Sequence, residues 1–169
     1  MKLTHFKGIP FSWPFRVRKL KKTKTFTQTF TFTKVKYDLG DDDQDDWNKL
    51  TGVKLHYFRP KKENMMVAWR WNLEKEKVQI CFYWNYNGKH HWTDPLMELD
   101  EGSNLTVDIT YDNYDASPYN YYPNYKITIS SVGQKVRKNY LFTNKTGWLI
   151  NTWFGGNRRP PNKIQIKVN

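Results

Sequence analysis

Cysteine and long apolar runs are nearly absent from this sequence. The one cysteine, Cys81, excludes an intramolecular disulfide framework. No stretch is apolar over the roughly 18 residues that a membrane-spanning helix needs. Residues 1–14 also lack the apolar segment of a secretory signal peptide. We therefore expect a chain that is made in a cytoplasm and has no membrane span.

Motifs of catalysis and cofactor binding are also missing. The sequence contains no G-x-S-x-G, Walker or G-x-G-x-x-G pattern, and its histidines do not have the spacing of zinc ligands. His90 and His91 are adjacent, and neighbours on a strand point to opposite faces of a sheet. The sequence thus favours a non-catalytic protein over an enzyme.

Positive charge and aromatic residues are abundant. The chain has 28 Lys and Arg against 16 Asp and Glu, a net charge of +12. Such a charge suits a polyanionic partner: nucleic acid, an acidic glycan, an anionic surface, or the acidic face of a larger assembly. Aromatic residues make up 17% of the chain, which suits both half-buried sheet faces and the stacking of sugars or bases. Both interpretations of the aromatic residues stay open.

Residues 1–24 are basic and contain no acidic side chain. Pro10 and Pro14 disfavour a helix there. We predict an extended basic arm that docks on a partner or on its own sheet, and the alternative is a solvated tail. The residues expected to contact a partner are Trp13, Arg16, Arg18, Lys19, Lys21 and Lys22.

From Thr25 to Thr33, threonine alternates with other residues, and Phe26, Phe30 and Phe32 share one face. This period of two predicts a long, half-buried strand. Further alternating strands are predicted at 53–59, 65–71, 77–86, 104–112, 124–132, 136–143, 147–154 and 163–168. Many short strands separated by turn signals are typical of an all-β sandwich or barrel. We expect one β-sandwich domain over residues 25–169.

The connections between the strands have their own signals. Asn87-Gly88 is typical of a hairpin turn. Residues 112–123 are rich in Tyr, Asn and Pro and predict a long aromatic loop. Room for a helical turn or two remains only at 94–101 and in the aspartate run that starts at Asp38.

Six aspartates lie within nine residues, from Asp38 to Asp46. Closely spaced carboxylates can bind calcium, although the run lacks the glycine and glutamate positions of an EF-hand. The alternative is an acidic loop that offsets nearby basic residues through a polar network. Six like charges without a proton donor are not expected to be catalytic. The candidate calcium ligands are Asp38, Asp41, Asp43 and Asp45.

A candidate binding face follows from the strand pattern. If Val78, Ile80 and Phe82 point inward, the residues between them point to the opposite face, where Met66, Ala68 and Arg70 from the preceding strand join them. Such a face could bind a glycan or another acidic ligand, and Tyr119–Tyr122 would add stacking rings. The alternative is an ordinary mixed face covered by a loop or subunit. The candidate ligand-binding residues are Arg70, Gln79, Tyr83, Asn85, Trp92 and Trp153.

The C-terminal part contains W-L-I-N-T-W-F-G-G-N at 148–157, followed by P-P-N-K-I-Q-I-K-V at 160–168. A strand that runs into F-G-G-N, then proline and a short closing strand, resembles the concanavalin-like jelly-roll group, which includes legume-type lectins and small polysaccharide lyases. The resemblance covers residues 25–169 and implies an antiparallel jelly-roll β-sandwich. Small jelly rolls of this kind are similar to phage virion proteins.

The lyase branch of this group implies an R-x-E-x-R strand, a Q-x-H strand and a tyrosine on the closing strand. Here Arg70 has no paired carboxylate in its strand, Cys81 stands in place of the histidine, and the closing strand has Lys163 but no tyrosine. These departures count against lyase activity.

Three functions remain as hypotheses. The first is a non-catalytic structural or binding module of a virion, attached to a capsid or tail and able to bind glycans. The second is a lyase on an acidic glycan, with His56 as base, Tyr83 as proton donor and Arg70 as the group that neutralises a carboxylate. The third is nucleic-acid binding through basic and aromatic residues.

Overall fold

The computed structural model describes residues 4–6, 9–11, 25–55, 62–115, 121–141, 147–150, 152, 154, 160 and 163–169. Of these, residues 4–6, 9–11, 112–115, 121–124 and 141 are described by their backbone alone.

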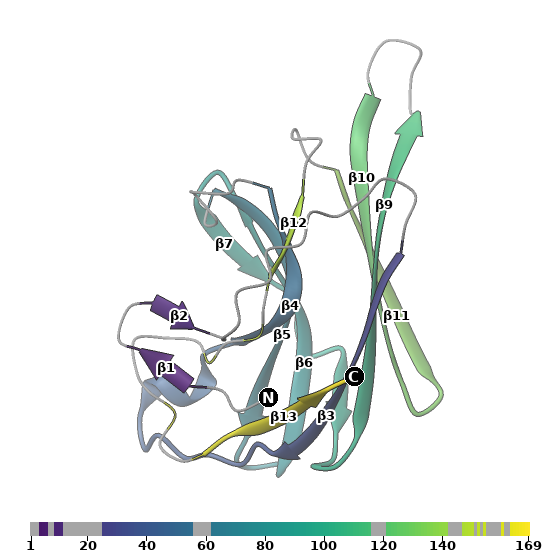
Figure 1. Cartoon of the computed structure of the whole chain (residues 1–169). Helices are drawn as coiled ribbons and strands as arrows, with labels where there is room; N and C mark the ends of the chain where they lie inside the picture. The colour runs from purple at the N-terminus through teal and green to yellow at the C-terminus, as the bar shows by residue number, and fades with distance from the viewer. Residues whose placement is uncertain are drawn as a thin grey trace.

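Two antiparallel sheets make up the body of the structure, and they face each other (Figure 1). The five-stranded sheet has the order β11 (Gln134–Leu141), β10 (Tyr121–Ser131), β9 (Asn104–Asp115), β3 (Thr25–Lys34) and β13 (Gln165–Val168). The six-stranded sheet has the order β12 (Trp148–Ile150), β4 (Asn48–Lys54), β5 (Glu63–Asn72), β6 (Lys77–Tyr86) and β7 (Lys89–Trp92), and β8 (Met97–Leu99) also pairs with β6. The all-β, two-sheet part of the fold prediction is therefore confirmed.

The chain passes between the sheets several times. After β3 it crosses to β4 and continues as the meander β4–β5–β6–β7. After β8 it returns to the first sheet, where β9 pairs with β3 and begins the meander β9–β10–β11. β12 then pairs with β4, and β13 closes the edge beside β3. Both edges of β4 and both edges of β3 are thus paired, which leaves these strands inside their sheets.

The core fills the space between the inner faces of the two sheets. Alternate residues of each strand point inward, as the period of two requires. Trp69 is the largest fully buried side chain, and it contacts Phe32 and Tyr37 with ring centroids 6.0 Å apart in each case. Inward positions of β6, β9 and β10, including Ile80, Ile109 and Ile127, are fully buried in the same cluster.

Several sequence predictions need correction. Residues 94–101 contain the strand β8 in place of a helical turn, and it pairs with β6 from Val78 to Ile80. The predicted loop 112–123 is largely strand, because β9 runs to Asp115 and β10 begins at Tyr121. Tyr86, the last residue of β6, is 49% exposed.

The predicted arm lies almost entirely outside the described residues. Within residues 1–24 the structure describes β1 (Thr4–Phe6) and β2 (Ile9–Phe11), which form a separate antiparallel pair (Figure 1). Trp13, Arg16, Arg18, Lys19, Lys21 and Lys22 are outside the described part, so their docking role stays a prediction. No helix among the described residues has the length and apolar character to cross a bilayer.

Candidate ligand-binding face

The candidate face lies on the six-stranded sheet and points away from the other sheet; we call it the outer face. Cross-strand pairing places Arg70 opposite Gln79, Ala68 opposite Cys81 and Met66 opposite Tyr83. These are the side chains that the alternation of β5 and β6 predicted to share a face. β7 then adds Trp92 opposite Tyr83 and His90 opposite Asn85.

The middle of the outer face is buried. Ala68 and Cys81 are fully buried, and Trp47 packs against them, with Tyr83 at the border of this cluster. Burial raises the pKa of the Cys81 thiol well above its usual value. A thiol in this environment is not a nucleophile. Trp47 was not predicted from the sequence as part of the face. Its position between the aspartate run and β4 is the feature of the sequence that could have suggested this role.

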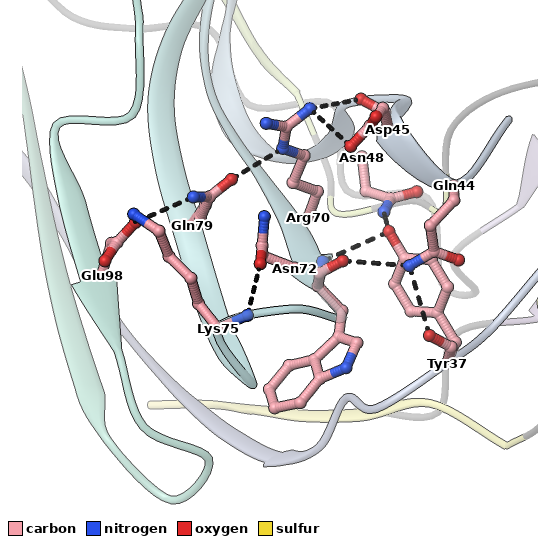
Figure 2. A network of polar contacts seen from close by, with 10 residues as sticks. Tyr37, Gln44, Asp45, Asn48, Arg70, Asn72, Lys75, Gln79 and Glu98 are labelled. Carbon is pink, nitrogen blue, oxygen red and sulfur yellow. Dashed lines mark hydrogen bonds and ion pairs between the residues drawn. The ribbon is translucent and has the colours of Figure 1, made fainter. Parts of the chain in front are cut away.

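A chain of polar contacts crosses one end of the outer face (Figure 2). The Arg70 guanidinium donates from Nε to Gln79 Oε1 over 2.9 Å, and its terminal nitrogen lies 3.0 Å from an Asp45 carboxylate oxygen. Gln79 Nε2 donates to Glu98 Oε1 over 2.8 Å, and Lys75 pairs with the same oxygen over 2.8 Å. These two contacts, the Lys75 one foremost, lower the pKa of Glu98.

This network changes the role assigned to two predicted ligand residues. The Gln79 side chain is buried and uses both its amide oxygen and its amide nitrogen inside the protein. The Arg70 guanidinium stacks on Trp47, 4.6 Å from the ring centroid, and pairs with Asp45. Both residues therefore brace the sheet, and ligand contact by them stays a prediction.

The aspartate run folds into a compact cap at the end of the sheet. Its centre is the 3-10 turn η1 (Asp42–Asp45), and Asp41 caps the turn by accepting a hydrogen bond from the backbone N–H of Asp43. Asp38 accepts one from Gly40 N over 2.8 Å. The interpretation of the run as a polar network is supported by these contacts and by the Asp45–Arg70 pair.

The calcium prediction finds no support in this arrangement. Among the residues that the structure describes, no group of three or more His, Cys, Asp or Glu side chains could hold a metal ion. The carboxylates of Asp38, Asp41 and Asp45 instead contact backbone N–H groups or Arg70.

Gln44 and Tyr37 fasten this cap to the core. Gln44 accepts from Leu39 N over 2.9 Å and donates to Trp71 O over 3.0 Å. The Tyr37 hydroxyl accepts from Asn48 Nδ2 over 3.0 Å and from Trp71 N over 3.3 Å (Figure 2). Burial raises the pKa of Tyr37, so the phenol stays protonated at neutral pH.

Tyr37→Phe is expected to lower the free energy of unfolding by about 1–3 kcal/mol, because it removes the buried hydroxyl that accepts hydrogen bonds from Trp71 N–H and Asn48 Nδ2. Urea denaturation followed by fluorescence measures the loss. Tyr86→Phe is the matched control, since Tyr86 is about half exposed, and it should change stability by less than about 0.5 kcal/mol. Equal losses in the two variants would contradict the role of the Tyr37 hydroxyl.

Three aromatic rings gather at the other end of the outer face. Ring centroids are 6.3 Å apart for Tyr83–Trp92, 6.5 Å for Tyr83–His90 and 6.1 Å for His90–Trp92, with interplanar angles of 11–13°. A single stacked column would make one of these distances about twice the others. The nearly equal distances instead place the three rings in a triangle with nearly parallel planes, which we call the ring triangle.

The ring triangle is open to solvent and lies beside positive charge. Trp92 is 52% exposed and His90 is also exposed. Lys49 Nζ lies 4.0 Å from the centroid of the Tyr83 ring. Burial, with a smaller contribution from Asp46, raises the pKa of Tyr83 to about 12. The Tyr83 phenol is thus a hydrogen-bond donor at neutral pH.

A buried polar atom lies next to the triangle. Asn85, which pairs across strands with His90, is only 6% exposed, and its side-chain oxygen has no hydrogen-bond partner among the described residues. A buried acceptor without a donor costs about 1–3 kcal/mol and calls for an explanation.

Two of the three residues proposed for lyase chemistry, Arg70 and Tyr83, lie apart on the outer face. Arg70 pairs with Gln79, four residues from Tyr83 along β6, which corresponds to about 13 Å of strand. The Arg70 guanidinium is directed at Asp45. His56, Trp153, Tyr119 and Asn120 lie outside the described residues, and Tyr121 and Tyr122 are described by their backbone alone, so the roles of these residues stay predictions.

No protein-family model matches the chain, and no curated protein sequence is similar to it. The function is therefore inferred from the geometry of the outer face.

Proposed function

We propose that the chain is a non-catalytic binding module that recognises an acidic glycan at the ring triangle. The observation that carries this proposal is the set of three nearly parallel rings, Tyr83, His90 and Trp92, with Trp92 52% exposed. Clustered, exposed aromatic rings are typical of stacking sites, because each ring offers a flat apolar surface to a ligand.

The surroundings of the rings supply the polar part of recognition. The Lys49 ammonium next to Tyr83 carries the charge that a carboxylate or sulfate group would need. The protonated Tyr83 hydroxyl can donate a hydrogen bond. Asn85 has a buried oxygen that still lacks a donor among the described residues, and a sugar hydroxyl or a bound water would satisfy it.

The same geometry supports binding over catalysis. Proton abstraction beside a uronate requires a base, a proton donor and a neutralising cation within reach of one sugar. Arg70 is held at the other end of the face by Asp45, and Cys81 is buried with a raised pKa. Arg70, the cation assigned to lyase chemistry, is therefore far from the ring triangle, where we propose that the rings serve as ligand contacts.

The finer assignment of the fold belongs to the same proposal. We infer a jelly-roll sandwich of the concanavalin-like kind that attaches to a virion through the basic arm, with its ring triangle turned to a host glycan. The two-sheet architecture and the net charge of +12 support this assignment. Mass photometry after gentle purification from the native source tests it: a very large particle is expected, and a free monomer would contradict attachment.

Trp92→Ala is expected to weaken glycan binding about tenfold or more, because a stacked ring contributes about 1–3 kcal/mol in alanine substitutions. A glycan array first identifies an acidic ligand, and titration calorimetry then measures its affinity for the wild type and variants. Tyr86→Ala is the matched control. Tyr86 is 49% exposed and lies in the same hairpin, but its position in β6 alternates with that of Tyr83.

Two outcomes would contradict the proposal. One is an array with no acidic glycan among the bound ligands. The other is an equal loss of affinity in Trp92→Ala and Tyr86→Ala, which would place the binding site away from the ring triangle.

A further inference from the structure

The outer side of the five-stranded sheet differs in chemistry from the face with the ring triangle. Threonines of β3 lie opposite polar residues of β9: Thr25 and Thr29 share hydrogen bonds with Thr110 and Thr106 over 3.0 and 3.1 Å. We call this surface the hydroxyl face. In each Thr–Thr pair one hydroxyl proton joins the two oxygens, so the second proton can be donated to an outside acceptor.

Four cations lie on the hydroxyl face: Lys126, Lys135, Arg137 and Lys167. Strand pairing places them there, because Lys126 pairs with Thr110, Lys135 with Ser130, Arg137 with Thr128 and Lys167 with Thr31. These cations make no ion pair or side-chain hydrogen bond with any residue that the structure describes. The described acid on this surface, Asp108, accepts a hydrogen bond from Thr27 over 2.6 Å.

Three cations of the six-stranded sheet differ from those of the hydroxyl face because they form ion pairs. There Arg70 pairs with Asp45, Lys75 with Glu98 and Lys77 with Asp100. These three cations are thus neutralised inside the protein. The positive charge of the hydroxyl face is left for an outside partner.

One end of the hydroxyl face is hollowed. The hollow has a volume of about 730 Å³ and is lined by the β10–β11 turn, by the start of β9 and by the segment before it, including Ser103, Thr106, Ser130 and Lys135. At its rim Val132 is 88% exposed with a φ of 36°. A β-branched residue rarely adopts this left-handed conformation. The hollow offers hydroxyls and one ammonium to an anionic group.

We propose that the hydroxyl face binds the phosphate backbone of double-stranded nucleic acid without sequence preference. Lys and Arg together with Ser, Thr and Asn are the side chains that contact phosphate oxygens in such complexes. None of the described side chains on this face is aromatic, so it lacks the stacking surface that sugars or unpaired bases use. The inference is independent of glycan binding, which uses the opposite sheet.

The geometry suits contact along a backbone. Lys135 and Arg137 are two residues apart on the edge strand β11, about 7 Å at the rise of a strand. Lys126 lies on the adjacent strand β10 opposite Asn139, so from Arg137 it is displaced by one strand spacing, about 5 Å, and by two residues along the strand, about 7 Å. A row of charges at this spacing can contact successive phosphates of one strand.

The test compares two double variants of the full chain that have the same net charge. Lys135→Ala/Arg137→Ala removes charge from the hydroxyl face, and Lys62→Ala/Lys89→Ala removes exposed charge beside the six-stranded sheet. Fluorescence anisotropy with a short DNA duplex is measured between about 50 and 200 mM salt. Each lost phosphate contact lowers the slope of log K against log salt by about 0.9, so the first variant should lose about 1.8 and the control much less.

Three results would overturn the inference. Equal slopes for both double variants would assign binding to the net charge or to residues 1–24. A change seen only with a sulfated polysaccharide, tested in parallel, would make the face a glycan site. Absence of duplex binding by the wild type at the lowest salt concentration would also exclude it.

Discussion

Gly52→Ala is expected to lower the free energy of unfolding by about 4 kcal/mol or more, and so to leave little folded protein if total stability is typical. Gly52 lies in β4 opposite Met66 of β5. A Cβ atom there would lie 2.2 Å from the Met65 carbonyl oxygen and 2.6 Å from Met66 Cα. Because both are backbone atoms, relief requires that β4 and β5 separate. Urea denaturation followed by circular dichroism measures the loss.

Gly40→Ala is the control for this prediction, since it makes the same chemical change without a collision. Gly40 has a φ of +70°, and a Cβ atom added to it would have no neighbouring atom within 4 Å. An alanine there costs about 1–2 kcal/mol for the left-handed conformation alone. A loss for Gly52→Ala no larger than that for Gly40→Ala would show that the close approach of β4 and β5 is not required for folding.

The inner faces of the sheets were predictable because alternation is a local signal. Val67 and Trp69 in β5, and Ile80 and Phe82 in β6, are each separated by one residue of the other face, and all four are buried in the core. Alternation did not predict segments whose structure depends on a partner strand. The segment 94–101 contains a short strand because β6 offers an open edge from Val78 to Ile80, which no local pattern reveals.

The candidate site was predictable as a face but not as a set of contacts. Alternation placed Arg70, Gln79 and Tyr83 together, and the pairing of β5 with β6 agrees. The partners that decide their roles come from elsewhere: Asp45 is 25 residues before Arg70 in the chain, and Glu98 is 19 residues after Gln79. Such separations depend on the whole fold, so the sequence could not show that Arg70 was already paired.

The two sheets divide the charge of the chain between them. On the six-stranded sheet, the aspartate run supplies the carboxylate that pairs with Arg70, and aromatic rings remain as the exposed feature. On the five-stranded sheet, Lys135 and Arg137 stay unpaired among the described residues. The acidic run thus offsets the charge of Arg70 locally, whereas the four cations of the hydroxyl face have no ion pair among the described residues. The proposed stacking site and the proposed polyanion site therefore face in opposite directions.

Cys81 in the native chain is expected to react with a thiol reagent about 10³ to 10⁶ times more slowly than in the unfolded chain, which is the usual range of unfolded fractions. The thiol is fully buried beneath Trp47 and Tyr83, so the reagent cannot reach it. Burial also raises the pKa of the thiol, so little of the reactive thiolate forms. Alkylation followed by mass spectrometry, at increasing urea concentrations, measures the protection.

Trp47→Ala separates local opening from global unfolding. It removes the largest side chain that covers Cys81, while the core between the sheets keeps its contacts. Alkylation in the absence of urea should then become at least about tenfold faster than the measured loss of global stability predicts, because access now needs only a local opening. Fast alkylation of the wild type at full stability would show that the middle of the outer face is open, and Trp47 would then not be its cover.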